Sequence, residues 1–317
     1  MPARTYDSLG FPIPVEFDPA AGGAGVSRSP SAHRDRTSSS GRRRPTITKR
    51  VVVLAIVVMG VLPLAAGPTI VSEFEAAVTR WSLERARWFE VRDEAAAAVG
   101  ELDRVIGWCG EDAELLCIRA SLRMDNRDLG GASRDASRAA ELSPTEADPL
   151  RIRAIVHASL GNVESAVADV ERACAIVGEA DPQGVNLRSY VRALVCEDLQ
   201  QAYDDIDKLI RTLGEPPPEF IDTRGYLLHL LGRHEESVRD LEDAIERMRE
   251  MRRQVTLLGG RIHPLDLARR LRLADHSLAV MIHHRGLALA ALGREAEAAA
   301  DFAMAVNKGY DPGRGIF

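Results

Sequence analysis

A pair of short amphipathic stretches that returns along the chain at a nearly constant interval is the feature that most constrains the fold. In the clearest copy, around residues 222–246, apolar side chains recur at helical spacing over 220–231 and again over 235–248, and Gly232 separates the two stretches. Each stretch has an apolar stripe on one face only, so the two are predicted to be helices that bury their stripes against each other. One such hairpin cannot cover both of its faces and therefore needs neighbours of the same kind.

Small residues in the first helix of each unit set the interval. They follow one another at steps of 34, 34, 35, 36 and 61 residues, and they are Ala86, Ala120, Ala154, Ser189, Gly225 and Gly286. A side chain this small allows two helix backbones to approach closely. Six units of this kind cover about three quarters of the chain.

The units resemble the tetratricopeptide repeat, a helical hairpin of 34 residues with small residues at fixed places. Two copies match best, at Gly225, Gly232, Ser237, Leu241 and Ala244, and at Gly286, Gly293, Ala298, Phe302 and Ala305. The resemblance implies an all-α fold, a tetratricopeptide-type α-solenoid in which the hairpins form a right-handed superhelix. It also implies that the first helices line a concave groove.

The groove is where the resemblance places a protein or peptide partner. The groove residues that it implies are Arg151, Ile155, Tyr190, Asp222, Tyr226, His229, His283 and Leu287. They include no lysine, so they differ from the carboxylate clamp of chaperone-binding members of the family. The predicted function is a membrane-anchored scaffold for protein–protein interaction, and the alternative is an accessory subunit or adaptor of an envelope enzyme complex.

Arginine precedes each small residue, and an acidic residue stands 16 positions after each arginine. The pairs are Arg85 and Glu101, Arg119 and Asp135, Arg153 and Asp169, Arg188 and Asp204, Arg224 and Asp240, and Arg285 and Asp301. In a hairpin this separation places one member on each helix at a similar height, which predicts a structural guanidinium–carboxylate pair in every unit. The alternative is an arginine ladder offered to an anionic ligand.

The single step of 61 residues predicts an insertion at about residues 246–278. The apolar stripe of one helix continues to Leu258, Gly259 and Gly260 break it, and a second stripe begins after Pro264. We expect an antiparallel helical arm that extends about 20 Å, at 1.5 Å per residue.

The arm is also basic, with six arginines in particular: Arg247, Arg252, Arg253, Arg269, Arg270 and Arg272. One hypothesis is that these side chains bind an acidic partner or anionic lipid headgroups, which would make attachment sensitive to salt. The other is that their aliphatic stems cover the apolar seam of the arm while their charged ends are solvated.

The N-terminal part of the chain has a different composition. Residues 1–49 are rich in Pro, Gly, Ser and Arg and are predicted to be a disordered basic tail. Residues 51–71 contain no charge and are long enough to cross a bilayer, so we predict a transmembrane helix over 50–71 and a repeat domain over 72–317.

Basic residues before the apolar segment predict a single-pass protein with its tail in the cytoplasm and its repeats on the opposite, periplasmic or extracytoplasmic side. The alternative is a signal peptide that is cleaved on export.

Catalytic motifs are absent from the sequence, so the chain is predicted not to be an enzyme and to need no cofactor or metal. His276, His283 and His284 are close together on one predicted helix, but their spacing does not bring three nitrogens to one point. They are predicted to be solvated or to line the groove. The net charge of −6 gives no reason to expect nucleic acid as a partner. The four cysteines have no C-x-x-C spacing and are predicted to be apolar filler.

Overall fold

The computed structural model describes residues 68–178 and 180–311. Within these ranges the chain forms twelve α-helices and no strand, so the prediction of an all-α fold is confirmed. The predicted disordered tail and residues 50–67 of the predicted transmembrane segment lie outside the described residues, whereas residues 68–71 form the first turn of a helix. Among the helices that are described, none combines the length and the hydropathy needed to cross a membrane.

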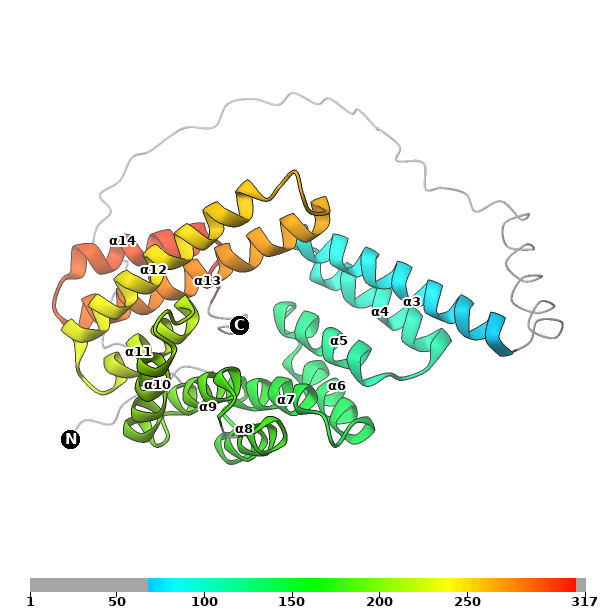
Figure 1. Ribbon diagram of the computed structural model, residues 1–317, viewed down its shortest axis with the longest axis horizontal. Helices are drawn as coiled ribbons and strands as arrows, with labels where there is room; N and C mark the ends of the chain where they lie inside the picture. The colour runs from blue at the N-terminus through cyan, green and yellow to red at the C-terminus, as the bar shows by residue number, and fades with distance from the viewer. Residues whose placement is uncertain (1–67, 179, 312–317) are drawn as a thin grey trace, which may run out of the picture. The chain divides into compact units, whose positions relative to one another are not determined.

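The helices follow one another in six antiparallel hairpins (Figure 1). The hairpins are α3 (Pro68–Val91) with α4 (Ala95–Cys109), α5 (Ala113–Asp125) with α6 (Leu129–Leu142), α7 (Ala147–Ser159) with α8 (Val163–Val177), α9 (Pro182–Val195) with α10 (Leu199–Leu213), α11 (Pro218–Leu230) with α12 (His234–Leu257), and α13 (Pro264–Ala291) with α14 (Glu295–Asn307). Each first helix contains one residue of the predicted small-residue series. The chain divides after Ala77 into two units, and the contacts described below belong to residues 78–317.

From the second hairpin to the sixth, the first helices form one layer, because α5 contacts α7, α7 contacts α9, α9 contacts α11, and α11 contacts α13. The second helices α6, α8, α10 and α12 each pack against the first helix of their own hairpin and against the first helix of the next. Every first helix in the middle of the array is thus held by four neighbours, and one face of the first-helix layer is not covered by the second helices.

The small residues lie where the two helices of a hairpin come closest. Ala120 and Ala154 have no exposed surface. At Gly225 a Cβ atom would lie 2.8 Å from Cγ of Leu241, and at Gly286 it would lie 2.7 Å from Cε1 of Phe302. In these two hairpins glycine therefore avoids an overlap between a Cβ atom and a bulky side chain of the second helix.

Replacing Gly225 by alanine should destabilise the protein by about 1–3 kcal/mol, because the added methyl group overlaps Leu241. The control is Gly100→Ala in α4, where nothing lies within 4 Å of the added Cβ. That substitution should raise stability by up to about 1 kcal/mol, the usual gain in a helix interior. Urea unfolding of both variants measures the two effects, and equal stability of Gly225→Ala and the wild type would show that Leu241 moves aside without cost.

The turn inside each hairpin contains a residue in the left-handed region. Three are the glycines Gly161, Gly232 and Gly293, with φ of 73°, 79° and 73°. The other three hairpins have Asp93, Arg127 and Cys196 at the equivalent place, with φ of 59°, 60° and 56°. The turn of the fourth hairpin differs from the others, because it also has Asp198 in the left-handed region, with φ of 46°. Left-handed φ is unfavourable for a residue with a Cβ atom.

The insertion is an antiparallel helical pair made from the second half of α12 and the first half of α13. Arg252 of α12 donates to both carboxylate oxygens of Asp275 of α13 at 2.8 Å, and this holds the two helices in register. Pro264 occupies the first turn of α13, where its missing N–H costs nothing. Because α13 is 28 residues long and uninterrupted, the arm is rigidly continuous with the first helix of the sixth hairpin.

Candidate functional site

The arginines of the 16-residue pattern make two-pronged ion pairs inside four hairpins. Nε and Nη2 of Arg153 donate to the two carboxylate oxygens of Asp169 at 2.7 and 2.6 Å. The same arrangement, with distances of 2.7–2.9 Å, joins Arg119 to Asp135, Arg224 to Asp240, and Arg285 to Asp301. In the first hairpin Nη2 of Arg85 lies 2.8 Å from Oε1 of Glu101.

The fourth hairpin departs from the pattern. Arg188 pairs with Asp205 at 3.5 Å, in place of the predicted Asp204. Asp204 instead accepts a hydrogen bond from Nε2 of Gln200 at 2.9 Å. The reason is the extra residue between the small position of this unit and its second helix, which turns Asp205 toward the arginine.

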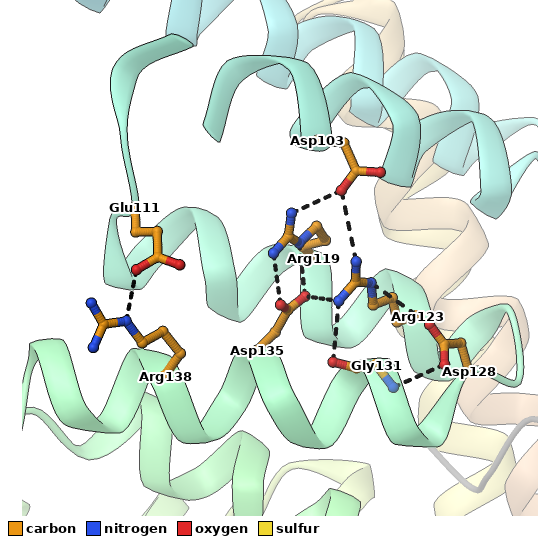
Figure 2. Close-up of polar contacts among 8 residues, drawn as sticks. All are labelled: Asp103, Glu111, Arg119, Arg123, Asp128, Gly131, Asp135 and Arg138. Atoms are coloured by element: carbon orange, nitrogen blue, oxygen red, sulfur yellow. Dashed lines mark hydrogen bonds and ion pairs between the residues drawn. The ribbon is translucent and has the colours of Figure 1, made fainter. Parts of the chain in front are cut away.

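Several of these arginines also reach the preceding hairpin, as Figure 2 shows for Arg119. Nη1 of Arg119 donates to Asp103 of α4 at 2.8 Å, and Nη1 of Arg224 donates to Asp207 of α10 at 2.9 Å. In the same way Arg188 lies 3.5 Å from Glu171 of α8. The acid that is reached in the preceding hairpin stands two residues after the acid of that hairpin's own ion pair, as Asp103 follows Glu101. This spacing of two is visible in the sequence and could have predicted the contact.

The two-pronged ion pairs are largely internal, whereas the side chain of Arg85 in the first hairpin is 41% exposed. Asp135 and Asp301 are each only 4% exposed, and the side chain of Arg119 is 13% exposed. An anionic ligand cannot compete for guanidinium groups that are already bonded on two or three sides. The arrangement therefore favours the structural interpretation, in which the arginines fix the register within a hairpin and between hairpins.

The residues predicted to line the groove divide into buried and half-buried groups. Asp222 and Tyr226 are buried, so they do not offer a surface to a partner. Arg151 is tied to Asp148 at 3.4 Å and to Asp181 at 3.2 Å. The half-buried residues, which we call the first-helix surface, are Ile155 of α7, Tyr190 of α9, His229 of α11, and His283 and Leu287 of α13.

A buried polar group lies beneath this surface. Nδ1 of His284 is 2.9 Å from Oδ1 of Asp222, so the imidazole N–H donates to the carboxylate. The ring of Tyr226 stacks on that imidazole with 4.2 Å between centroids. His284 is 1% exposed, which corrects the prediction that it is solvated or lines the groove. The correction follows from the packing of α13 against α11, which encloses one of two adjacent histidines.

Three other histidines lie near His284 and form with it a cluster made of His229, His234, His283 and His284. The rings of His229 and His234 are 5.1 Å apart, and His283 stacks on Tyr310 at 4.2 Å. Burial, together with neighbouring imidazoles, lowers the pKa of His229 to about 4 and the pKa of His283 to about 3. Both rings are therefore neutral near pH 7, and the first-helix surface is aromatic and uncharged there.

Three arginines of the basic arm find partners within α12 and α13. Arg247 donates to Asp243 at 2.8 Å, Arg253 donates to Glu250 at 2.9 Å, and Arg252 binds Asp275 as described above. Arg270 makes no ion pair with any residue that the structure describes. Half of the six predicted arginines thus serve the fold of the arm.

Arg269 and Arg272 instead contact the first two hairpins. Arg269 lies 3.7 Å from Glu90, and Arg272 lies 3.6 Å from Glu90 and 3.4 Å from Asp93. Arg272 is also 3.7 Å from Asp125 of α5. We call these contacts the clasp. The arm therefore has an acidic partner in its own chain, about 180 residues earlier in the sequence.

Arg272→Glu should weaken the clasp and lower the stability of the protein by about 1 kcal/mol at low salt. The new carboxylate would lie close to the carboxylates of Glu90, Asp93 and Asp125, which it would repel. The loss should shrink at about 0.5 M salt, where charges several ångströms apart are screened. A second change, Glu90→Arg, should restore part of the loss. Denaturant unfolding at both salt concentrations measures these effects, and an unchanged midpoint in Arg272→Glu would mean that the clasp is not formed in solution.

In the part of the chain that the structure describes, no group of three or more His, Cys, Asp or Glu residues is placed to hold a metal ion. The four cysteines are free thiols. Cys117 and Cys174 are buried, as expected of apolar filler, and burial raises the pKa of Cys117 to about 12. Cys196 is exposed in a turn, so the prediction that the cysteines are apolar filler is wrong for this residue.

Comparison with known proteins gives structural similarity only. No family model matches the chain, and no curated protein matches it. A tetratricopeptide repeat protein from Parabacteroides merdae is similar over 74% of this chain and 94% of its own, with 19% identity and a TM-score of 0.44. A thermophilic TPR protein from Thermus thermophilus is similar over 62% of this chain and 97% of its own, with 16% identity and a TM-score of 0.46.

Proposed function

We propose that the chain is a tetratricopeptide-type scaffold that binds a protein or peptide segment on its first-helix surface. The observation that carries the proposal is the neutral, aromatic character of that surface across α9, α11 and α13, where Tyr190, His229, His283 and Leu287 are half-buried. Two interior features, the Arg–acid pairs and the Asp222–His284 pair, hold this surface in place.

The chemistry of the surface indicates the chemistry of the partner. Aromatic and imidazole rings that are uncharged near pH 7 give the best contacts with apolar or aromatic side chains and with a peptide backbone. Arg151, which stands beside the surface on α7, is already neutralised by Asp148 and Asp181. A partner segment with an apolar anchor residue is therefore favoured over one that depends on a terminal carboxylate.

Leu287→Ala in the full chain tests the proposal. Partner recovery from detergent extracts should fall about tenfold, the effect of losing about 1.4 kcal/mol at an interface anchor. The control is Val306→Ala in α14, which is 62% exposed on a second helix and should leave recovery unchanged. If the two variants recovered the partner equally, the first-helix surface would not be the binding site.

We further propose that the scaffold is attached to a membrane through residues 50–71, with its repeats on the side opposite the tail. The uncharged run over 51–71 and the arginines before it support this arrangement. A reporter that is active only outside the cytoplasm, fused after Phe317, should be active. A silent reporter, with activity of a cytoplasmic reporter at the same position, would refute the topology.

A further inference from the structure

All three tryptophans of the chain lie on the first hairpin, and all three are exposed. Trp81 and Trp88 of α3 are 53% and 42% exposed, and Trp108 of α4 is 62% exposed. Indole is the largest apolar side chain, and leaving three of them in water forgoes a large stabilisation by burial. This concentration on one hairpin marks it as a candidate interaction surface.

Trp81 and Trp88 share one face of α3, because they are seven residues apart. Arginines alternate with them on that face. The guanidinium carbon of Arg85 lies 4.7 Å from the centre of the Trp81 ring, and that of Arg92 lies 4.5 Å from the centre of the Trp88 ring. The face therefore combines broad aromatic rings with guanidinium groups stacked on them, a favourable pairing. Arg85 also binds Glu101 of α4, and Arg92 also binds Glu94.

The remaining faces of α3 are used by the fold. Ser82 and Ala86 are buried toward α4, and Glu90 faces Arg269 and Arg272 in the clasp. Glu90 is nine residues from Trp81, which places the clasp and the indole on opposite sides of the helix. The tryptophan face thus points away from the interior contacts of this hairpin.

Trp108 lies at the end of α4 that is adjacent to the beginning of α3. Its neighbour Cys109 lies across from Thr79, whose hydroxyl is 3.8 Å from the cysteine sulfur. Since α3 and α4 are antiparallel, the end of α4 that carries Trp108 is the end that faces the beginning of α3. That end is the one nearest in sequence to the uncharged run over 51–71, which stops ten residues before Trp81.

We propose that this tryptophan face lies on the headgroup layer of a lipid bilayer. The inference rests on the proposed membrane attachment. Tryptophan is enriched at membrane interfaces because its ring is apolar while its N–H can still reach water or lipid oxygen. Arg85 and Arg92 are already paired with Glu101 and Glu94, so the attraction to the bilayer comes from the indole rings. Residues 78–109 hold five arginines and six acidic residues, so zwitterionic lipid is sufficient and net charge is not the attraction.

Tryptophan fluorescence reads out this face alone, because the chain has no other tryptophan. The full chain is reconstituted into phosphatidylcholine vesicles whose acyl chains carry bromine either near the headgroup or near the bilayer centre. We expect about twofold quenching by bromine near the headgroup, less quenching near the centre, and a blue-shifted emission maximum, as for an indole at the interface. Variants that retain one tryptophan each, with phenylalanine at the other two positions, assign the signal to Trp81, Trp88 or Trp108.

The outcomes separate the inference from the attachment on which it rests. Vesicle flotation after alkaline extraction reports attachment independently of fluorescence. A chain that floats but whose tryptophans are unquenched and open to acrylamide overturns the inference and leaves the attachment standing. A chain that is removed by alkali but is quenched beforehand supports the inference and refutes the anchor. Protection from acrylamide that rises with protein concentration and does not depend on bromine would assign the face to a second copy of the chain and overturn the inference. A chain that neither floats nor is quenched overturns both the inference and the attachment.

Discussion

Asp135→Ala is expected to lower the free energy of unfolding by about 3–4 kcal/mol, the range for removing one member of a buried ion pair. Asp135 is 4% exposed and accepts from two arginines, Arg119 at 2.7 Å and Arg123 at 2.9 Å. Their side chains are 13% and 17% exposed, so neither is well placed to gain water when the carboxylate is lost. Two poorly solvated positive charges would then face each other between α5 and α6.

The same site supplies its own controls. Arg119→Ala should cost less than Asp135→Ala, because Arg123 still satisfies the carboxylate. Asp103→Ala should change stability by no more than about 0.5 kcal/mol, since Asp103 is 51% exposed although it binds the same guanidinium. Urea unfolding ranks the three variants, and a loss in Asp103→Ala equal to that in Asp135→Ala would contradict the view that buried pairs set the register.

Acidification from pH 7.5 to 5 should destabilise the protein through the histidine cluster. His229 and His283 have folded-state pKa values of about 4 and about 3, below the ordinary value of 6.5. As the pH falls below 6.5, the unfolded chain takes up protons that the folded chain refuses, so stability decreases down to the folded pKa values. At pH 5 this amounts to about 2 kcal/mol for each histidine, from 1.36 kcal/mol per pKa unit.

The comparison that isolates this effect uses the variant with His229→Gln and His283→Phe. Phenylalanine keeps an aromatic ring against Tyr310, and neither replacement titrates. His229 faces Tyr226 and His234, and His283 faces His284, Phe302 and Tyr310. The remaining histidines of the cluster, His234 and His284, are present in both proteins. The difference in unfolding free energy between pH 7.5 and 5 should be about 4 kcal/mol smaller in the variant, twice the value for one histidine. An equal pH dependence would show that both histidines are protonated in the folded state.

Features that depend on one hairpin could be read from the sequence. The spacing of 16 between Arg153 and Asp169 corresponds to a real ion pair because both residues belong to one helical hairpin. The small residue at Gly225 likewise follows from the local crossing of α11 and α12. Even within one hairpin, a single extra residue is enough to move the partner of Arg188 from Asp204 to Asp205.

Features that depend on how hairpins stack could not be read in the same way. Arg119 reaches Asp103 only because α5 packs against α4 at a particular height. The contacts of Arg272 with Glu90 and Asp93 join segments about 180 residues apart, and no periodicity connects them. His283 and His284 are adjacent in sequence and look equivalent there, yet only His284 is enclosed, because enclosure depends on the packing of α13 against α11.

The most direct test of the central claim, that a partner binds on the first-helix surface, is site-specific photocrosslinking in the full chain. A photoreactive phenylalanine derivative is placed at Leu287 on α13 or, as a matched control, at Met304 on α14, which is 39% exposed. Irradiation should give a crosslinked partner from position 287 and none from position 304. Crosslinking from position 304 alone, or equally from both, would contradict the claim.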